Sequence, residues 1–416
     1  MIKFFTKENI LFFLFFISLI LFKNDLNSKV IIGMVAISLY YFNYNSFKEV
    51  LLKNTPILIF FVLILISLCY TSDIKIGLKR VERLTIIPSC LLIFTYLSRK
   101  NIKRKHIYFL YILVILFATL YSHFKVISLF IENKETSLRH FFNLNYSYKA
   151  LGNTINLHTT YYSMYILLAI VFLLDFIRSN KRTIHFTALY VCLIIYFSLF
   201  IFQLSARISI GILYLIVLLN IIHFIINKKQ LLKGAIVLVL FHIIGFSILM
   251  NVGVTKYRFQ HLLGFTYYTG YTVNDTNHKT KLWTAAASAN NNILIGNGIG
   301  DIQQSLNEQY EKYKLEKPLK NDYNSHNQYI EFYVGLGIIG LGVFIYLLFN
   351  YFWIFIKFKD FIGLQFIIIV TITSITECIW NRHHGIVFIA FWLFYLNSYQ
   401  NQKAILNKAV VDNTKL

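Results

Sequence analysis

The sequence predicts an all-α membrane protein with about a dozen membrane-spanning helices and one long loop on the outer face. Hydrophobic residues make up 57% of the 416-residue chain and charged residues only 14%, whereas soluble domains carry about 25% charged residues. Apolar runs recur along the whole chain and are separated by short basic segments. Backbone groups in lipid must be paired, and the runs show no two-residue alternation, so helices are predicted rather than barrel strands.

Each apolar run predicts one helix. The expected spans lie near residues 9–22, 30–44, 57–70, 84–98, 107–122, 159–177, 184–202, 208–226, 234–250, 328–354, 361–378 and 385–399. No cleavage site of the A-x-A kind follows the first run, so it is predicted to be a retained span rather than a signal peptide.

Alternate loops are rich in Lys and Arg, and the positive-inside rule places them, with both termini, in the cytoplasm. These basic segments are Lys48/Lys53, Arg99–Lys105, Arg178–Arg182, Lys228–Lys233, Lys357/Lys359 and the C-terminal tail. The formal net charge of +22 is therefore interpreted as an orientation signal. No nucleic-acid-binding motif accompanies the charge, so nucleic acid is not an expected partner.

One basic stretch falls on the predicted outer face. Lys75, Lys79, Arg80 and Arg83 lie within residues 72–83, which follow the third predicted span. Two explanations are open. Either the stretch is an amphipathic helix at the membrane surface, or one early span is assigned wrongly.

The predicted spans divide the chain into N-terminal transmembrane helices (1–250), a large outer loop between the ninth and tenth spans (251–327), C-terminal transmembrane helices (328–400) and a cytoplasmic tail (401–416). Within the loop, a helix is expected over residues 283–292, followed by a glycine-rich turn at 296–300. Asp301 is then expected to cap a helix with Ile302, Leu306, Tyr310 and Tyr313 on one face.

The pair His326-Asn327 stands where this loop enters the tenth span, and nine residues later the pattern Gly337-x-x-Gly340 follows. Glycines inside a membrane helix allow a neighbouring helix to approach closely, so Gly337 and Gly340 are predicted to form a helix-packing motif. An imidazole at the membrane surface can accept a proton from a hydroxyl, which makes His326 a candidate base.

The His-Asn, nine residues, Gly-x-x-Gly pattern resembles the signature of the O-antigen ligase / O-antigen polymerase family. Further elements of the chain are similar to that family in the same order, over roughly residues 150–400. They are His158-Thr-Thr-Tyr161, Ser205-Ala206-Arg207, Trp283 with the turn Gly296–Asp301, and the last hairpin, which contains Glu377 and Arg382.

The resemblance implies a metal-independent, cofactor-free glycosyltransferase with a membrane-embedded GT-C-like fold in the bacterial inner membrane. Such enzymes move a glycan from undecaprenyl pyrophosphate to a sugar hydroxyl on the periplasmic face, in lipopolysaccharide biosynthesis. His326 would be the catalytic base and Asn327 would orient the base or the substrate. Arg207, Lys279 and Arg382 would bind the pyrophosphate. Lys279 stands where the family pattern has Arg, and it keeps the charge without the bidentate fork.

Several alternatives remain at this point. The acceptor is lipid A core for a ligase, a second lipid-linked glycan for a polymerase, or a protein side chain. From another class, the chain could be a membrane transporter or flippase. Arg207 could reach lipid headgroups, and Arg382 could form a structural ion pair with Glu377. Neither a metal site nor a disulfide framework is predicted, because the sequence has no Asp-x-Asp or His-Glu-x-x-His motif and its four cysteines are scattered.

Overall fold

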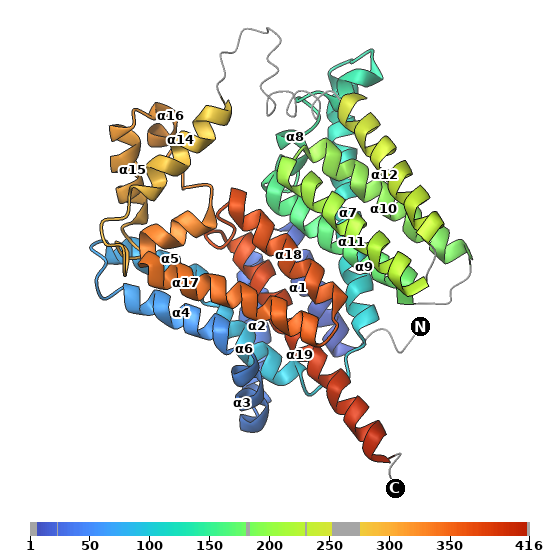
Figure 1. Ribbon diagram of the computed structural model, residues 1–416, viewed down its shortest axis with the longest axis horizontal. Helices are drawn as coiled ribbons and strands as arrows, with labels where there is room; N and C mark the ends of the chain where they lie inside the picture. Colours follow the sequence, from blue (N-terminus) through green and yellow to red (C-terminus); the bar gives the residue numbers. More distant parts are fainter. Residues whose placement is uncertain (1–5, 23, 180–183, 229–230, 252–274, 414–416) are drawn as a thin grey trace. The chain divides into compact units, whose positions relative to one another are not determined.

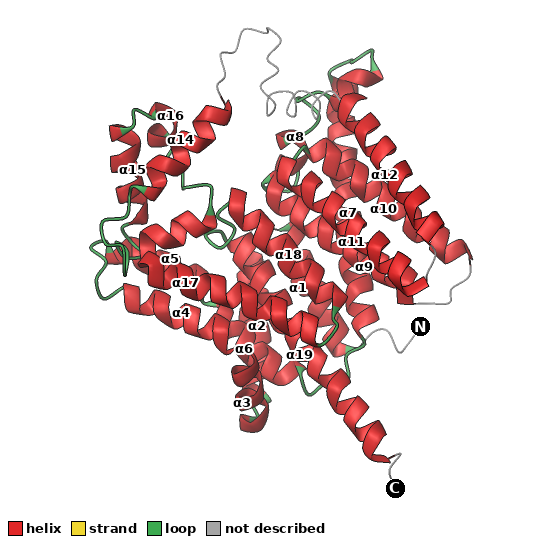
Figure 2. Cartoon of the chain, in the orientation of Figure 1, coloured by secondary structure: helices red, strands yellow, loops and turns green. Residues whose placement is uncertain are grey.

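The computed structural model describes residues 6–22, 24–179, 184–228, 231–251 and 275–413 (Figure 1). Every regular element in these ranges is a helix, as Figure 2 shows, so the predicted all-α class is confirmed. The first part of the predicted outer loop, residues 252–274, lies outside the described residues.

Among the described residues, five helices are long and apolar enough to cross a membrane, which is the character of a membrane-embedded protein. They are α7 (Arg104–Glu132), α9 (Thr159–Ser179), α10 (Ile184–Leu204), α11 (Arg207–Lys228) and α17 (Gln328–Lys357). A sixth span is formed if α3 (Tyr44–Lys53) and α4 (Thr55–Ser67) count as one, although they meet at an angle of 83°. Pro56, in the first turn of α4, is compatible with a helix start at this bend.

The chain forms two compact units. The first unit comprises residues 1–103 and 277–416 and the second comprises residues 104–276. Besides α3, α4 and α17, the first unit holds α1 (Lys7–Leu21), α2 (Asn24–Tyr40), α5 (Ile74–Leu84), α6 (Ile86–Leu97), α14 (Asp275–Ala287), α15 (Ile302–Lys312), α16 (Glu316–Lys320), α18 (Phe361–Thr376) and α19 (His383–Asn413). The second holds α7, η2 (Leu138–Phe142), α8 (Lys149–Asn153), α9, α10, α11 and α12 (Leu231–Asn251).

Some helix limits differ from the expected spans. The helix predicted over 107–122 extends as α7 from Arg104 to Glu132, because its apolar pattern continues past His123. The basic stretch after the third predicted span folds as α5, a separate helix before α6. The C-terminal segment predicted as a tail continues α19 as far as Asn413.

Loops predicted on the cytoplasmic side meet at one end of the first unit. The buried side-chain oxygen of Asn54, at the bend between α3 and α4, accepts hydrogen bonds from Tyr351 Oη at 3.0 Å and Asn397 Nδ2 at 3.1 Å. Arg99 donates a hydrogen bond to the carbonyl of Tyr41. The bend after α3 therefore contacts α17 and α19, and the segments after α2 and α6 contact each other.

An aromatic cluster joins α4, α17 and the hairpin between α18 and α19. The ring of Phe60 lies 4.9 Å from Phe332 and 5.5 Å from Phe344, centroid to centroid. Trp380 packs edge-on against Phe344 at 5.4 Å and is almost completely buried. Edge-to-face contacts of this kind add to the stabilisation that comes from burial alone. The cluster fixes the start of α17 and the hairpin against each other.

Helix α17 is interrupted at Gly337, whose backbone has φ 65° and ψ −165°. The loop over residues 293–298 fills the interruption: Asn297 N donates to Val334 O at 2.9 Å and Gly298 N to Gly335 O at 3.0 Å. On the other side of the break, Ile338 N donates to Ile293 O at 2.8 Å and Ile339 N to Leu294 O at 3.2 Å. The loop thus supplies partners to backbone groups that a break in lipid would leave unpaired.

The glycines of the predicted helix-packing motif therefore have another role, and that part of the prediction is wrong. A Cβ atom at Gly337 would meet the backbone of Leu294 and Ile295, so the close neighbour is a loop rather than a helix. At Gly340, the atoms nearest to an added Cβ belong to Leu336 of the same helix. The glycine-rich turn also uses positive φ, with 74° at Gly296 and 97° at Gly298.

Replacing Gly337 with Ala is expected to lower the free energy of unfolding by about 1–3 kcal/mol, because alanine is strained at positive φ. The added Cβ would also collide with the docked loop. Gly342→Ala is the matched control, since a Cβ there has no heavy atom within 4 Å. Thermal unfolding of the purified protein in detergent compares the two variants. Equal melting temperatures for both would contradict the loop-filled break.

The outer loop differs from the prediction in three details. The expected helix at 283–292 lies earlier, as α14, and its last residue is Ala287. Asp301 precedes α15 but makes no capping bond, since its carboxylate accepts from Ser72 N at 2.6 Å and Asp73 N at 2.8 Å. Ile302, Leu306 and Tyr310 form the buried face, but Tyr313 is 40% exposed.

Candidate functional site

His326 stands on a tight turn just before α17. Its backbone has a positive φ of 48°, and its N–H donates to Asn324 Oδ1 at 3.0 Å. A non-glycine residue at positive φ is uncommon and is found where surrounding contacts hold it. The side chain is 34% exposed, and the ring stands perpendicular to that of Tyr323 at 5.5 Å. The imidazole is therefore fixed by its backbone and remains accessible from outside.

The carboxylate of Glu377 lies beside this imidazole. Glu377 Oε2 is 3.5 Å from His326 Nδ1, and the Glu377 side chain is 20% exposed. Glu377 follows directly after α18, where its extended backbone ends the helix. The sequence suggested Arg382 as a possible partner of Glu377, and the structure shows a contact of this carboxylate with the histidine. A carboxylate at Nδ1 favours the tautomer in which Nε2 is free to accept a proton.

Asn327 is a helix cap. Its side-chain oxygen accepts hydrogen bonds from Tyr329 N at 2.9 Å and Ile330 N at 3.2 Å, and the side chain is buried. These bonds satisfy backbone donors of the first turn of α17 that have no partner within the helix. The described contacts of this oxygen give Asn327 a structural role in holding the turn. Its expected role in orienting the base or the substrate stays a prediction.

Beneath the turn lies Glu331, which the sequence analysis did not identify. Its side chain is completely buried and accepts five hydrogen bonds: from Ser325 N at 3.2 Å, Ser325 Oγ at 2.8 Å, Asn381 Nδ2 at 2.7 Å, Arg80 Nη1 at 3.2 Å and Cys378 Sγ at 3.7 Å. A buried carboxylate needs such partners to remain charged. Glu331 therefore links the His326 turn, the hairpin after α18 and helix α5.

The same contacts explain the basic stretch on the predicted outer face. Arg80 reaches inward from α5 to Glu331, and Arg83 donates to the carbonyl of Asn381 at 3.1 Å. Residues 72–73 of the preceding loop bind Asp301. The interpretation of residues 72–83 as an amphipathic helix is supported, since α5 buries Gly77, Val81 and Leu84 and exposes its lysines. One signal in the sequence pointed to Glu331, namely an acidic residue within a long apolar helix.

Two other ionisable groups near Glu331 are held neutral. Burial raises the pKa of the Cys378 thiol well above its ordinary value, and the Glu331 carboxylate raises it further. Burial likewise raises the pKa of Tyr310, again assisted by Glu331. A thiol with a raised pKa is a poor nucleophile. Cys378 is thus a structural residue, whereas the His326 imidazole is accessible.

Arg207 belongs to the second unit, where it is the first residue of α11 and half-buried. The turn before it contains Ser205 at φ 50°. Three buried polar atoms surround this position in the sequence and have no hydrogen-bond partner within the described part of the chain: Gln203 Nε2, Ser205 Oγ and Ser209 Oγ. Buried donors in this condition call for water or a ligand. With a guanidinium and a helix N-terminus, they favour an anion.

The structure gives fewer contacts for the other predicted site residues. Arg382 is exposed on the hairpin next to Asn381, and its charge acts on His384 at the start of α19. Lys279 lies on α14, but its side chain is outside the described residues. His158 is exposed ahead of α9, and its Nδ1 accepts from Thr160 N at 3.4 Å.

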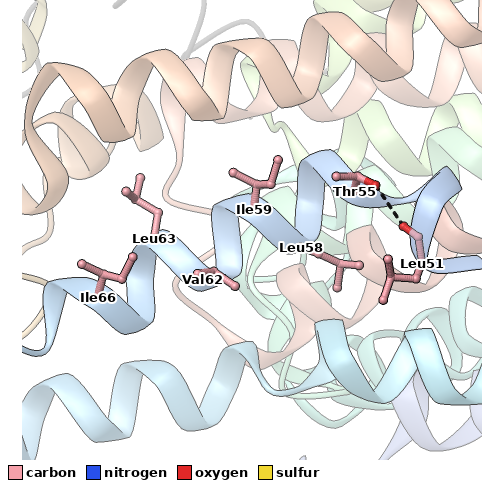
Figure 3. Close-up of a pocket in the computed structure, with 7 residues that line it drawn as sticks. All are labelled: Leu51, Thr55, Leu58, Ile59, Val62, Leu63 and Ile66. Carbon is pink, nitrogen blue, oxygen red and sulfur yellow. Dashed lines mark hydrogen bonds between the residues drawn. The ribbon is translucent and has the colours of Figure 1, made fainter. Parts of the chain in front are cut away.

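An apolar depression of about 310 Å³ runs along α4 (Figure 3). Its lining residues are aliphatic except Thr55, whose hydroxyl donates to the carbonyl of Leu51 at 3.2 Å. They are Leu51, Thr55, Leu58, Ile59, Val62, Leu63 and Ile66. Such a surface offers nothing to a sugar or a phosphate and suits a hydrocarbon chain, so the candidate site is the cluster around His326.

Within the described ranges, no group of three or more His, Cys, Asp or Glu side chains is arranged to hold a metal ion. The chain matches no protein-family profile, and no curated protein matches it significantly.

Proposed function

We propose that this protein is a metal-independent glycan transferase on the periplasmic side of a bacterial inner membrane. It transfers an oligo- or polysaccharide from undecaprenyl pyrophosphate to a sugar hydroxyl, as in the O-antigen ligase / O-antigen polymerase family that its sequence resembles. The observation that carries the proposal is the His326–Glu377 pair: an accessible imidazole, held on a strained turn, with a carboxylate at Nδ1.

In the proposed reaction, His326 Nε2 takes the proton of the acceptor hydroxyl. The acceptor oxygen attacks the anomeric carbon of the donor, and the bond from that carbon to the pyrophosphate oxygen breaks. The electron pair leaves with undecaprenyl pyrophosphate. Glu377 stabilises the imidazolium as it forms, and cationic side chains neutralise the charge on the departing pyrophosphate. The proposal assigns that neutralisation to Arg207 and Lys279, with Arg382 at the hairpin.

The proposal includes a GT-C-like arrangement of twelve spans with both termini in the cytoplasm. Contacts within the first unit support the proposed division of these segments between two sides. Segments proposed to be periplasmic meet one another: residues 72–83, 301–331 and 377–382 are joined through Asp301 and Glu331. Segments proposed to be cytoplasmic meet at Asn54 and Tyr41. If an odd number of spans between two of these segments were assigned wrongly, the two segments would lie on opposite sides of the membrane and could not be in contact.

Deletion of the gene tests the function. Surface lipopolysaccharide and lipid-linked glycan are extracted in parallel from the deletion strain and from the strain carrying the wild-type gene. A ligase predicts loss of long polymer from lipid A and its accumulation on undecaprenyl pyrophosphate. A polymerase predicts lipid A with a single repeat unit. Unchanged glycan pools would contradict both reactions and would favour protein glycosylation or transport.

Replacing Arg207 with Lys is expected to raise the KM for the lipid-linked donor roughly 10- to 100-fold, since a charged hydrogen bond contributes about 1.5–3 kcal/mol. Lysine keeps the charge but loses the bidentate geometry that suits a phosphate. Initial rates with purified protein and extracted donor measure this effect. Arg178→Lys, on α9 of the same unit, is the control for a general effect of the substitution. Unchanged donor KM would remove Arg207 from the pyrophosphate site.

The break in α17 is the observation that favours a transporter, since broken helices often form the substrate site of such proteins. However, loop 293–298 already pairs the backbone groups on both sides of Gly337. These groups are then not available to coordinate a transported ion or solute. The proposed transferase explains the presence of the His326–Glu377 pair. Transport is therefore the second candidate.

A further inference from the structure

Helix α5 has an exposed side with two kinds of side chain. Ile74 and Leu78, four residues apart, are 55% and 54% exposed and border the buried face formed by Gly77, Val81 and Leu84. Isolated exposed apolar residues are ordinary on a protein surface, but here they form a row along one edge of a helix. In a protein embedded in a membrane, such a row suits contact with acyl chains.

Next to this row lies a row of cations. Lys75, Lys79 and Arg83 follow one another at intervals of four residues, so their side chains lie on one face and repel one another. Lys75 and Lys79 are exposed and form no ion pair with another described residue. Glu82 is the one acidic residue within the helix. Because these three cations repel one another, anions from outside the chain would stabilise them.

The helix is held firmly in place. Asp73 caps it by accepting from Ile76 N at 2.8 Å, and the Asp301 carboxylate binds the backbone of the two residues before it. At its other end Arg83 donates to Asn381 O. The apolar and basic rows are thus presented in a fixed orientation, which lowers the conformational entropy lost on binding.

We propose that α5 is an interfacial helix that binds the phosphate groups of anionic phospholipids through Lys75, Lys79 and Arg83, with Ile74 and Leu78 among the acyl chains. The periplasmic leaflet follows from the proposed orientation of the chain. Lipid binding itself does not depend on glycan transfer, so a failure of the transfer reaction leaves this inference intact. Arg83 and Arg80 connect the bound lipid surface to Asn381 and Glu331 beneath His326.

Lipid retention tests the basic row. Full-length protein is reconstituted in nanodiscs of phosphatidylcholine with phosphatidylglycerol, released, and analysed by native mass spectrometry for bound lipid. Lys75→Gln/Lys79→Gln is expected to weaken phosphatidylglycerol binding roughly 10- to 30-fold. Lys317→Gln/Lys320→Gln removes the same charge from the exposed side of α16 and is expected to change nothing. Equal retention by both double variants would overturn the proposal.

Insertion is measured separately. In a Cys69→Ser/Cys192→Ser background, a fluorophore attached at Leu78→Cys should be quenched by a lipid-borne nitroxide more strongly than one at Lys79→Cys. Quenching of the residue-78 label by aqueous iodide alone would place α5 away from the bilayer and refute the inference. If stoichiometric undecaprenyl diphosphate displaces phosphatidylglycerol, the cations bind the donor lipid. That result would equally refute binding of bulk lipid.

Discussion

Replacement of His326 with Ala is expected to reduce kcat for glycan transfer about 10²- to 10⁴-fold, the usual contribution of a general base. The half-exposed ring contributes little to the hydrophobic core, and the turn is held through Asn324, Asn327 and Ser325. The variant should therefore be produced at normal levels. The KM for the lipid-linked donor should change much less than kcat, because the base acts on the acceptor.

The measurement is single-turnover transfer by purified protein with extracted lipid-linked glycan, together with the surface lipopolysaccharide gel. Glu377→Gln should slow the reaction less than His326→Ala, because the amide still contacts Nδ1 but cannot stabilise the imidazolium. In the double variant the loss should equal that of His326→Ala alone, since Glu377 acts through the histidine. Full activity of His326→Ala at normal protein levels would exclude it as the base.

The sequence predicted the helical class well because apolar runs and the pairing of backbone groups in lipid leave few alternatives. His326 was found through its position at the end of the outer loop. Its partner was missed because Glu377 lies far along the chain, directly after the end of α18. Contacts between distant segments leave no periodic pattern in a single sequence, so composition and spacing do not reveal them.

The glycines illustrate a different limit. Gly337 and Gly340 have the spacing of a helix–helix contact, and that spacing does not specify which segment approaches. In the structure the approaching segment at Gly337 is the loop 293–298, which contains Gly296 and Gly298 at positive φ. Asp301 shows the same limit: its position ahead of a helix predicted a cap, but its carboxylate binds the backbone of residues 72 and 73 instead. In both cases the sequence pattern predicted a local role, whereas in the structure the residue contacts a segment that is distant along the chain.

Replacement of Glu331 with Ala is expected to lower the free energy of unfolding by about 3–5 kcal/mol, because it leaves a partner cation without its counter-ion. The Arg80 side chain is only 16% exposed, and Ser325 and Asn381 lose their acceptor at the same time. Urea or thermal unfolding in detergent measures the change. Glu311→Ala, which removes an exposed carboxylate from α15, is the control and should fall within about 0.5 kcal/mol of the unmodified protein.

A double-mutant cycle separates the ion pair from the rest of the cluster. Arg80→Gln in the Glu331→Ala background should cost less than Arg80→Gln alone, because the cation has no partner left to lose. The remaining loss then measures the bonds to Ser325 and Asn381, which hold the turn of His326. If Glu331→Ala unfolds like Glu311→Ala, the buried carboxylate does not hold the turn. If stability falls while the fraction that remains folded transfers glycan at the normal rate, Glu331 supports the fold but not the position of the base.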